Sequence, residues 1–293
     1  MDELAEFIDL AKNNSNIIAI GTEGASNNTA ATHDVWTDLD ITVFAADPDQ
    51  EDGQAWIRHF GQPTIVQQLD DQGLFGDTGH WTSFLTRYAG TKRIDFKLAP
   101  AADINAYLAG DTLNTLIWTR QDGKVAPRLT SGESHNLTLP NQKKFDAHVN
   151  QLYWIAGNVV KGLARRNLVY ANEQFNQELR PELLYLMALQ EASQLPNGFD
   201  PGANYKYLPA VLSNQRRGQL ANTYNQSTLV DTLAALRTAI NLAEIYIRND
   251  AAALKLEVPD FVTRAVTQLT QWLVALAQQL TPEEGPDAIS RHD

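Results

Sequence analysis

The sequence predicts a protein that joins an N-terminal α/β or α+β half to a C-terminal helical half. Up to about residue 130, short β-branched or aromatic runs alternate with polar stretches, a pattern typical of strands. After about residue 142, apolar residues recur at helical spacing. A chain of 293 residues, 43% hydrophobic and 20% charged, is long enough for one large domain or two of average size.

The N-terminal half contains one amphipathic helix and five predicted strands. Apolar residues at Leu4, Phe7, Ile8 and Leu10 predict the helix. The predicted strands are IIAI at 17–20, DITVFA at 40–45, PTIVQQL at 63–69, WTSFLTRY at 81–88 and RIDFKLA at 93–99.

A polar stretch from Thr119 to Gln142, rich in Gly, Pro and Ser, is the predicted linker. We therefore predict one domain over 1–135 and a helical domain over 136–293. The helices of the second domain are predicted from three apolar stripes, which we interpret as core: Phe145, Val149, Leu152, Ile155, Val159 and Leu163; Leu229, Leu233, Leu236 and Ile240; Val262, Val266, Leu269, Leu273, Leu276 and Leu280.

The composition excludes several classes of function. A net charge of −12 argues against a nucleic-acid groove, which needs clustered Lys and Arg, and suits a cationic small ligand better. The chain has no cysteine, which excludes disulfides, thiolate metal sites and a cysteine nucleophile, and its six histidines show no HxxxH spacing. No apolar run approaches the roughly 18 residues of a membrane span, and the N-terminus lacks a basic signal segment. We expect a cytoplasmic protein that does not contact membranes.

Two aspartates, Asp38 and Asp40, lie one residue apart where a polar loop enters a predicted strand. Residues i and i+2 of a strand point to the same face, so both carboxylates project together. Two like charges held this close favour a bound cation, and Mg²⁺ prefers carboxylate oxygen while keeping open positions for phosphates. The alternative is a solvated turn before a strand.

Neighbouring features favour the metal site. Gly21 and Gly24 follow the strand IIAI and would let backbone amides approach a phosphate. Asp95 lies mid-strand between Ile94 and Phe96, where an unpaired carboxylate is costly to bury, so we predict it as a third ligand. The order of strand, glycine turn, DxD strand and later aspartate strand resembles that of nucleotidyltransferases, in which metal ions orient a nucleoside triphosphate.

Five segments carry a more specific resemblance: EGASNN with DVWTDLDITVF, HFGQPTIVQQ, RIDFKLAP, VVKGLARRNLVYANEQFNQELRPELL and GANYKYL, within roughly residues 15 to 215. On these segments the chain resembles the aminoglycoside 6-adenylyltransferases, also called streptomycin adenylyltransferases, of the nucleotidyltransferase superfamily. The resemblance implies an α+β fold with a nucleotidyltransferase-type mixed-sheet domain, a C-terminal helical bundle domain and an active site in the cleft between them.

The resemblance also implies the chemistry of individual residues. ATP is the implied donor, with Mg²⁺ held by Asp38, Asp40 and Asp95. Glu173, where relatives often carry Asp, is the implied catalytic base, and Asp95 is the residue that would replace it in that function. The alternative for Glu173 is an ion pair with Arg180 or another cation on the helix surface.

The remaining implied site residues bind the nucleotide. Lys161 and Lys206 are the implied partners of the β- and γ-phosphates. The superfamily typically has Gly-Ser in the phosphate turn, whereas this chain has Gly24 and Ala25, with Ser26 one place later. Either the turn shifts so that Ser26 serves, or backbone amides alone bind the triphosphate.

Three functions are therefore consistent with the sequence. The leading hypothesis is transfer of AMP from ATP to a hydroxyl of an aminoglycoside, with streptomycin as the implied acceptor. The second is a nucleotidyltransferase that acts on another hydroxylated metabolite or on a protein. The third is a binding protein that has lost turnover through Ala25. We expect ATP and a cationic aminoglycoside as partners, no nucleic acid, and a monomer.

Overall fold

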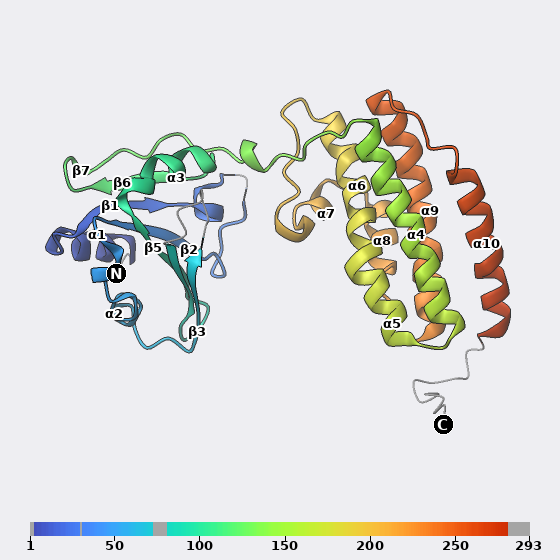
Figure 1. Ribbon diagram of the computed structural model, residues 1–293, viewed down its shortest axis with the longest axis horizontal. Coiled ribbons are helices and arrows are strands. Elements are labelled where there is room, and N and C mark those ends of the chain that lie inside the picture. The colour runs from blue at the N-terminus through green and yellow to red at the C-terminus, as the bar shows by residue number, and fades with distance from the viewer. Residues whose placement is uncertain (1–2, 30, 73–80, 281–293) are drawn as a thin grey trace. The chain divides into compact units, whose positions relative to one another are not determined.

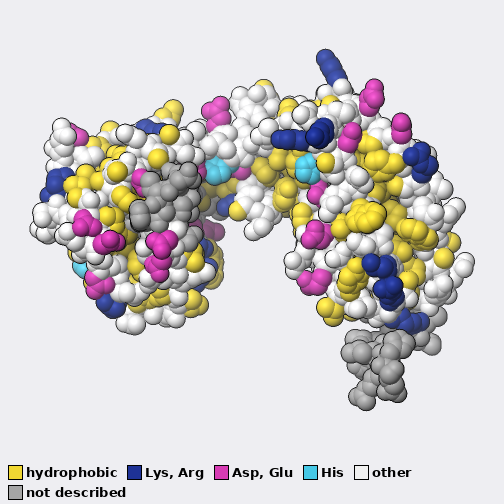
Figure 2. All heavy atoms as spheres, in the orientation of Figure 1, with side chains coloured by type: hydrophobic (Ala, Val, Ile, Leu, Met, Phe, Trp, Pro, Cys, Tyr) yellow, Lys and Arg dark blue, Asp and Glu magenta, His cyan; other side chains and the backbone are white. Residues whose placement is uncertain are grey.

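The computed structural model describes residues 3–29, 31–72 and 81–280 (Figure 1). The chain divides into two compact units, Met1–Ser134 and His135–Asp293. No helix in the described ranges combines the length and the hydropathy that a membrane span requires. Figure 2 shows acidic and basic side chains interspersed on the visible surface of each unit.

The first unit is built on a mixed β-sheet with short helices packed against it (Figure 1). Within the described residues the sheet has seven strands, in the order β3-β4-β5-β2-β1-β6-β7. The strands are β1 (Ile17–Thr22), β2 (Leu39–Ala45), β3 (Ile65–Gln72), β4 (Trp81–Arg87), β5 (Arg93–Pro100), β6 (Thr115–Thr119) and β7 (Gly123–Lys124). The α-helices are α1 (Glu3–Asn13), α2 (Gly53–His59) and α3 (Ile104–Gly110). Because β2 and β5 run parallel while the other neighbours are antiparallel, the predicted α+β class is confirmed.

All five predicted strands and the predicted N-terminal helix form, and the described part of this unit also contains two α-helices and two strands that the sequence pattern did not predict. Two of them, α2 and α3, have seven residues each, fewer than the window of about 11 to 18 residues in which helical periodicity becomes visible. The other two, β6 and β7, pair with each other, and β7 lies inside the stretch predicted as linker.

Aromatic side chains pack on both faces of this sheet. On one face, Phe7 of α1 stacks on Phe60 with ring centroids 4.3 Å apart, and Trp56 of α2 stacks on Phe96 of β5. On the other face, Phe44 of β2 meets Tyr107 of α3 edge to face at 5.1 Å. Because successive strand residues alternate between faces, the central pair β2 and β5 is buried on both sides.

The second unit contains only helices in its described part, several of which run side by side (Figure 1). Two long helices start at polar caps, because the side chains of Asn141 and Thr228 accept hydrogen bonds from the N–H groups of Lys144 and Asp231. The helices are α4 (Gln142–Ala164), α5 (Leu168–Glu173), a π-helix (Gln174–Leu179), α6 (Arg180–Gln194), α7 (Leu208–Val211), α8 (Asn214–Asn222), α9 (Leu229–Leu254) and α10 (Val262–Gln279).

The three predicted apolar stripes lie in α4, α9 and α10, and most of their residues are buried in one core. Leu280, the last residue of the third stripe, follows the end of α10. Helix α6, which the stripes do not include, adds Leu183, Leu186 and Met187 to the same core.

In the described part of the helical unit, the carboxyl group of Asp250 is buried without a hydrogen-bond partner. Both side-chain oxygens of Asp250 on α9 lack one, and the residue is fully buried. Burial, reinforced by the negative charge of Glu191 on α6, raises the pKa of Asp250 to about 8. The folded protein therefore keeps a proton on Asp250 over the range of about pH 4 to 8, in which the unfolded chain has lost it.

We expect the free energy of unfolding to decrease as the pH rises through this range, by up to about 1.4 kcal/mol per pH unit from this one group. Asp250→Asn, which is neutral at every pH, should remove that part of the slope and melt at a higher temperature than the wild type near pH 8. Chemical denaturation between about pH 5 and 8 measures both slopes. Asp260→Asn makes the same substitution at an exposed position and should leave the slope unchanged. Equal slopes in Asp250→Asn and the wild type would mean that Asp250 is ionised in the folded protein.

Candidate active site

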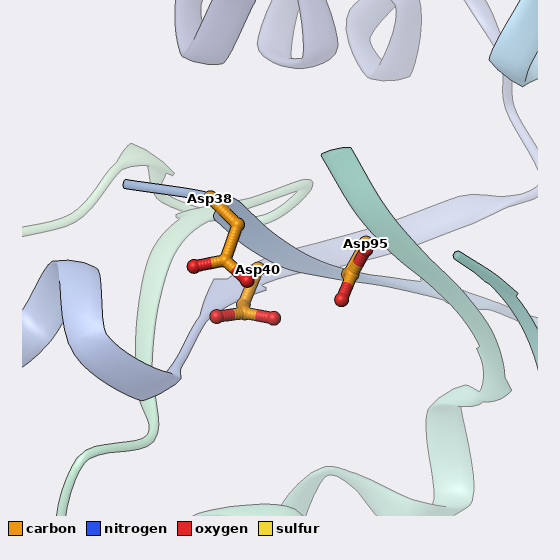
Figure 3. A group of neighbouring side chains, drawn as sticks. All are labelled: Asp38, Asp40 and Asp95. Atoms are coloured by element: carbon orange, nitrogen blue, oxygen red, sulfur yellow. The ribbon is translucent and has the colours of Figure 1, made fainter. Parts of the chain in front are cut away.

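Asp38, Asp40 and Asp95 lie together on one face of the sheet (Figure 3). Asp40 on β2 and Asp95 on β5 are direct partners in the parallel register, and Asp38 immediately precedes β2. Asp38 shares the face of Asp40 because the two are separated by one residue of extended chain. One oxygen from each carboxylate lies within 4.8 Å of the others. These three residues, the aspartate cage, are thus close enough to share one cation.

Burial changes the proton affinity of Asp40 in the aspartate cage. Asp95 is only 4% exposed, whereas Asp38 and Asp40 are partly exposed. Burial raises the pKa of Asp40 to about 7; Lys97 opposes this shift, and the negative charges of Asp38, Glu23 and Asp95 add to it. A cation bound among the carboxylates would favour their ionised forms and reverse the shift.

An arginine that the sequence reasoning missed contacts two of the three carboxylates. Arg93 Nε donates to Asp95 Oδ1 at 3.0 Å, and Nη2 donates to Asp95 Oδ2 at 2.5 Å. Arg93 Nη1 also lies 3.2 Å from Asp38 Oδ2. Arg93 and Asp95 are two residues apart on β5, so the alternation of strand side chains could have indicated that they share a face.

A second unpredicted ion pair lies next to the aspartate cage. Lys97, two residues after Asp95 on β5, donates to the carboxylate of Glu23, and both side chains are largely buried. Thr42 Oγ1 also donates to Glu23, and the Glu23 N–H donates to the Asp40 carbonyl oxygen at 3.3 Å. These contacts tie the segment after β1 to the two strands that carry the cage.

The glycine turn follows Glu23 directly. Gly24–Asn27 form a single 3₁₀ turn, in which Gly24 has φ +67° and a Cβ would lie 2.4 Å from Asp40 Oδ2. Only glycine fits there without displacing the carboxylate. Ser26 Oγ donates to the Glu23 carbonyl oxygen at 2.9 Å, so this hydroxyl already has a partner inside the turn. Phosphate binding by Ser26 or by the amides stays a prediction.

The other predicted site residues belong to the helical unit and are exposed. Glu173 ends α5 at the junction with the π-helix, and its carboxylate accepts a hydrogen bond from Gln177 at 2.6 Å. Single turns of π-helix are frequent at functional sites. Lys161 Nζ lies 5.5 Å from the ring centroid of Tyr170, and Lys206 Nζ lies 5.0 Å from that of Tyr207.

The part of the alternative that pairs Glu173 with Arg180 is wrong, and pairing of Glu173 with another surface cation stays a prediction. Arg180 is buried, donates to Asn176 and Thr223, and stacks on Tyr224 with its guanidinium carbon 3.6 Å from the ring centroid. The sequence could not indicate this, because Thr223 and Tyr224 are more than 40 residues away in the chain.

A sequence model of the streptomycin adenylyltransferase family matches residues 2–274. The chain belongs to this family. This member of the streptomycin adenylyltransferase family is 27% identical over 268 residues to an aminoglycoside 6-adenylyltransferase of Bacillus subtilis (strain 168), covering 90% of this chain and 94% of that protein. It is 28% identical over 222 residues to an aminoglycoside 6-adenylyltransferase of Campylobacter jejuni, covering 75% of this chain and 77% of that protein. The crystal structure of an aminoglycoside 6-adenyltransferase from Bacillus subtilis matches with a TM-score of 0.47 and 25% identity, over 94% and 97% of the two chains.

Membership in the streptomycin adenylyltransferase family confirms the resemblance inferred from the five segments. It also confirms that this family member is a nucleotidyltransferase enzyme. The functions of the individual site residues are not tested by these similarities and stay predictions.

Proposed function

We propose that this family member transfers AMP from ATP to a hydroxyl of an aminoglycoside, with Mg²⁺ as the metal and streptomycin as the acceptor. The observation that supports the proposal most directly is the aspartate cage, three carboxylates within 4.8 Å beside a glycine turn. The relatives named aminoglycoside 6-adenylyltransferases support the acceptor class. A net charge of −12 also suits a polycationic acceptor.

The residues of the aspartate cage fit Mg²⁺ by their chemistry. They offer three carboxylate oxygens, which are the hard ligands that this ion prefers, and Asp95 is a buried carboxylate that needs a cationic partner. Asp38, Asp40 and Asp95 would hold the metal. When bound, the metal supplies positive charge against the charge that develops on the transferring phosphoryl group.

At the α-phosphorus, the reaction forms one bond and breaks one. The acceptor hydroxyl oxygen bonds to the α-phosphorus of ATP, the bond from that phosphorus to the oxygen bridging to the β-phosphate breaks, and pyrophosphate leaves. Glu173 accepts the hydroxyl proton as general base. Lys161 and Lys206 bind the β- and γ-phosphates, each as a point charge on a flexible stem. Glu173, Lys161 and Lys206 are all exposed in the helical unit.

The glycine turn binds the triphosphate in this proposal, and two variants test it. Ala25→Ser should tighten ATP binding by up to about 1 to 2 kcal/mol through a new hydrogen bond to phosphate. Ser26→Ala should change the affinity little, because the Ser26 hydroxyl bonds to the Glu23 carbonyl oxygen. Calorimetric titration with ATP measures both. Weaker binding by Ser26→Ala, with no gain in Ala25→Ser, would indicate a shifted turn. If neither variant changed the affinity for ATP, this loop would not be the triphosphate site.

The proposed function as a whole is tested by magnesium-dependent release of pyrophosphate from ATP across a panel of acceptors. We expect release with streptomycin, none without an acceptor, and none after the metal is chelated. Release only with another acceptor would support a nucleotidyltransferase of different specificity. Binding of ATP and streptomycin without any release would support a binding homologue that has lost turnover.

A further inference from the structure

Arg93 contacts the carboxylates that the proposed function assigns to the metal. All three guanidinium nitrogens are engaged: two with Asp95, at 3.0 and 2.5 Å, and one with Asp38, at 3.2 Å. We propose that Arg93 is a displaceable internal counter-ion, which occupies the aspartate cage in the metal-free protein and competes with the metal for Asp38 and Asp95. This inference rests on the proposed metal site.

Without a metal, the buried Asp95 needs a positive partner. An unpaired ionised carboxylate is costly in the interior, and the two-pronged contact of a guanidinium satisfies both of its oxygens. The neighbouring cation, Lys97, forms an ion pair with Glu23, which is itself buried. Among the described residues, Arg93 is therefore the cation that contacts Asp95 and Asp38 directly, whereas Lys97 acts on Asp40 through its charge.

The contacts of Arg93 and of a metal at these carboxylates oppose each other. Both are cations and both would use oxygens of Asp38 and Asp95, so each disfavours the other by like-charge repulsion at contact distance. Arginine stays charged at all accessible pH values, so the repulsion between Arg93 and the metal cannot be relieved by loss of a proton from Arg93. The Arg93 side chain is 31% exposed, and its long stem lets the guanidinium turn toward solvent or an incoming phosphate.

The alternative is that Arg93 orients the carboxylates for the metal. Whether metal affinity rises or falls when Arg93 is replaced therefore decides between the two functions. Hydrogen-bonding partners behind metal ligands often orient them and raise metal affinity, commonly by about 10- to 100-fold. An orienting Arg93 would therefore strengthen metal binding, whereas a competing Arg93 weakens it.

The test is calorimetric titration of nucleotide-free, full-length protein with Mn²⁺ alone. We expect Arg93→Gln to bind the ion about tenfold more tightly than the wild type, because the competitor has been removed. Arg87→Gln is the matched control: Arg87 is the exposed cross-strand partner of Arg93 on β4, and its loss makes the same charge change. The control should change the affinity by less than about threefold, because Arg87 is exposed and solvent screens its charge.

Thermal unfolding keeps the test valid if Arg93→Gln folds poorly without metal. Its melting temperature should fall below that of the wild type in chelator and recover more strongly with Mn²⁺. Arg93→Lys keeps the charge but loses the two-pronged contact, and should show a smaller gain in affinity. Weaker or unchanged Mn²⁺ binding by Arg93→Gln, with normal binding by the wild type, would overturn the inference alone. Absence of Mn²⁺ binding to the wild type would overturn the proposed metal site and the inference with it.

Discussion

Asp40→Asn is expected to lower adenylyl transfer by about 100-fold or more, the usual cost of losing a major electrostatic contact to the transition state. Asp40 faces Asp95 in the β2–β5 register, so the amide removes one of the three charges of the aspartate cage. The fold should persist, because burial raises the pKa of Asp40 to about 7 and the metal-free wild type already carries a partly neutral group there. Pyrophosphate release at saturating ATP and streptomycin measures the loss.

The matched control for this prediction is Asp49→Asn. Asp49 is exposed beyond the other end of β2, so the variant makes the same charge change away from the cage and should keep wild-type turnover. The melting temperature of metal-free Asp40→Asn should equal or exceed that of the wild type, since repulsion among the three carboxylates is relieved. Turnover above about a tenth of the wild-type value would contradict the assignment of Asp40 as a metal ligand.

Glu173→Gln is expected to lower turnover by about 100- to 10,000-fold, the range for loss of a positioned general base, with little change in ATP or streptomycin affinity. The amide keeps the shape of the side chain and its contact with Gln177, but it cannot accept the hydroxyl proton. Arg180, one of the expected partners of a merely structural Glu173, is bound to Asn176 and Thr223 instead.

A pre-steady-state measurement of the chemical step decides the function of Glu173. Glu178→Gln is the matched control, because Glu178 is another exposed glutamate within the adjoining π-helix. It should react at the wild-type rate. A near-normal rate of the chemical step in Glu173→Gln would indicate that Asp95 or solvent, and not Glu173, is the general base.

The elements that could be predicted from the sequence are those with a long or strongly apolar pattern. Strand β2 is visible in DITVFA as a nearly continuous apolar run, which is typical of a central strand buried on both faces, and β5 is visible in RIDFKLA as an alternation of charged and apolar residues. The short helix α2 is held in place by contacts such as that of Trp56 with Phe96, which lie 40 residues apart. A local pattern does not contain such a contact, so the helix could not be predicted.

At the candidate site, the three aspartates were predictable from local signals, and the contacts of the neighbouring cations were not. The spacing of Asp38 and Asp40 and the apolar surroundings of Asp95 are local signals. Arg93 and Lys97 flank Asp95 at two residues on either side, so strand alternation alone places them on its face. Which carboxylate each cation reaches depends on the neighbours of β5 and on the segment before the glycine turn, and these are long-range pairings.

The parallel register of β2 and β5 also constrains how this sequence can evolve. Side chains alternate between the two faces, so inserting or deleting one residue within β5 before Asp95 would turn that aspartate toward the apolar face that now holds Phe96. A conservative replacement of Ile94 would instead leave every carboxylate in place. Natural variants should therefore differ in side chains along these strands far more readily than in strand length. Selection that preserves the aspartate cage would act on the number of residues as well as on their identity.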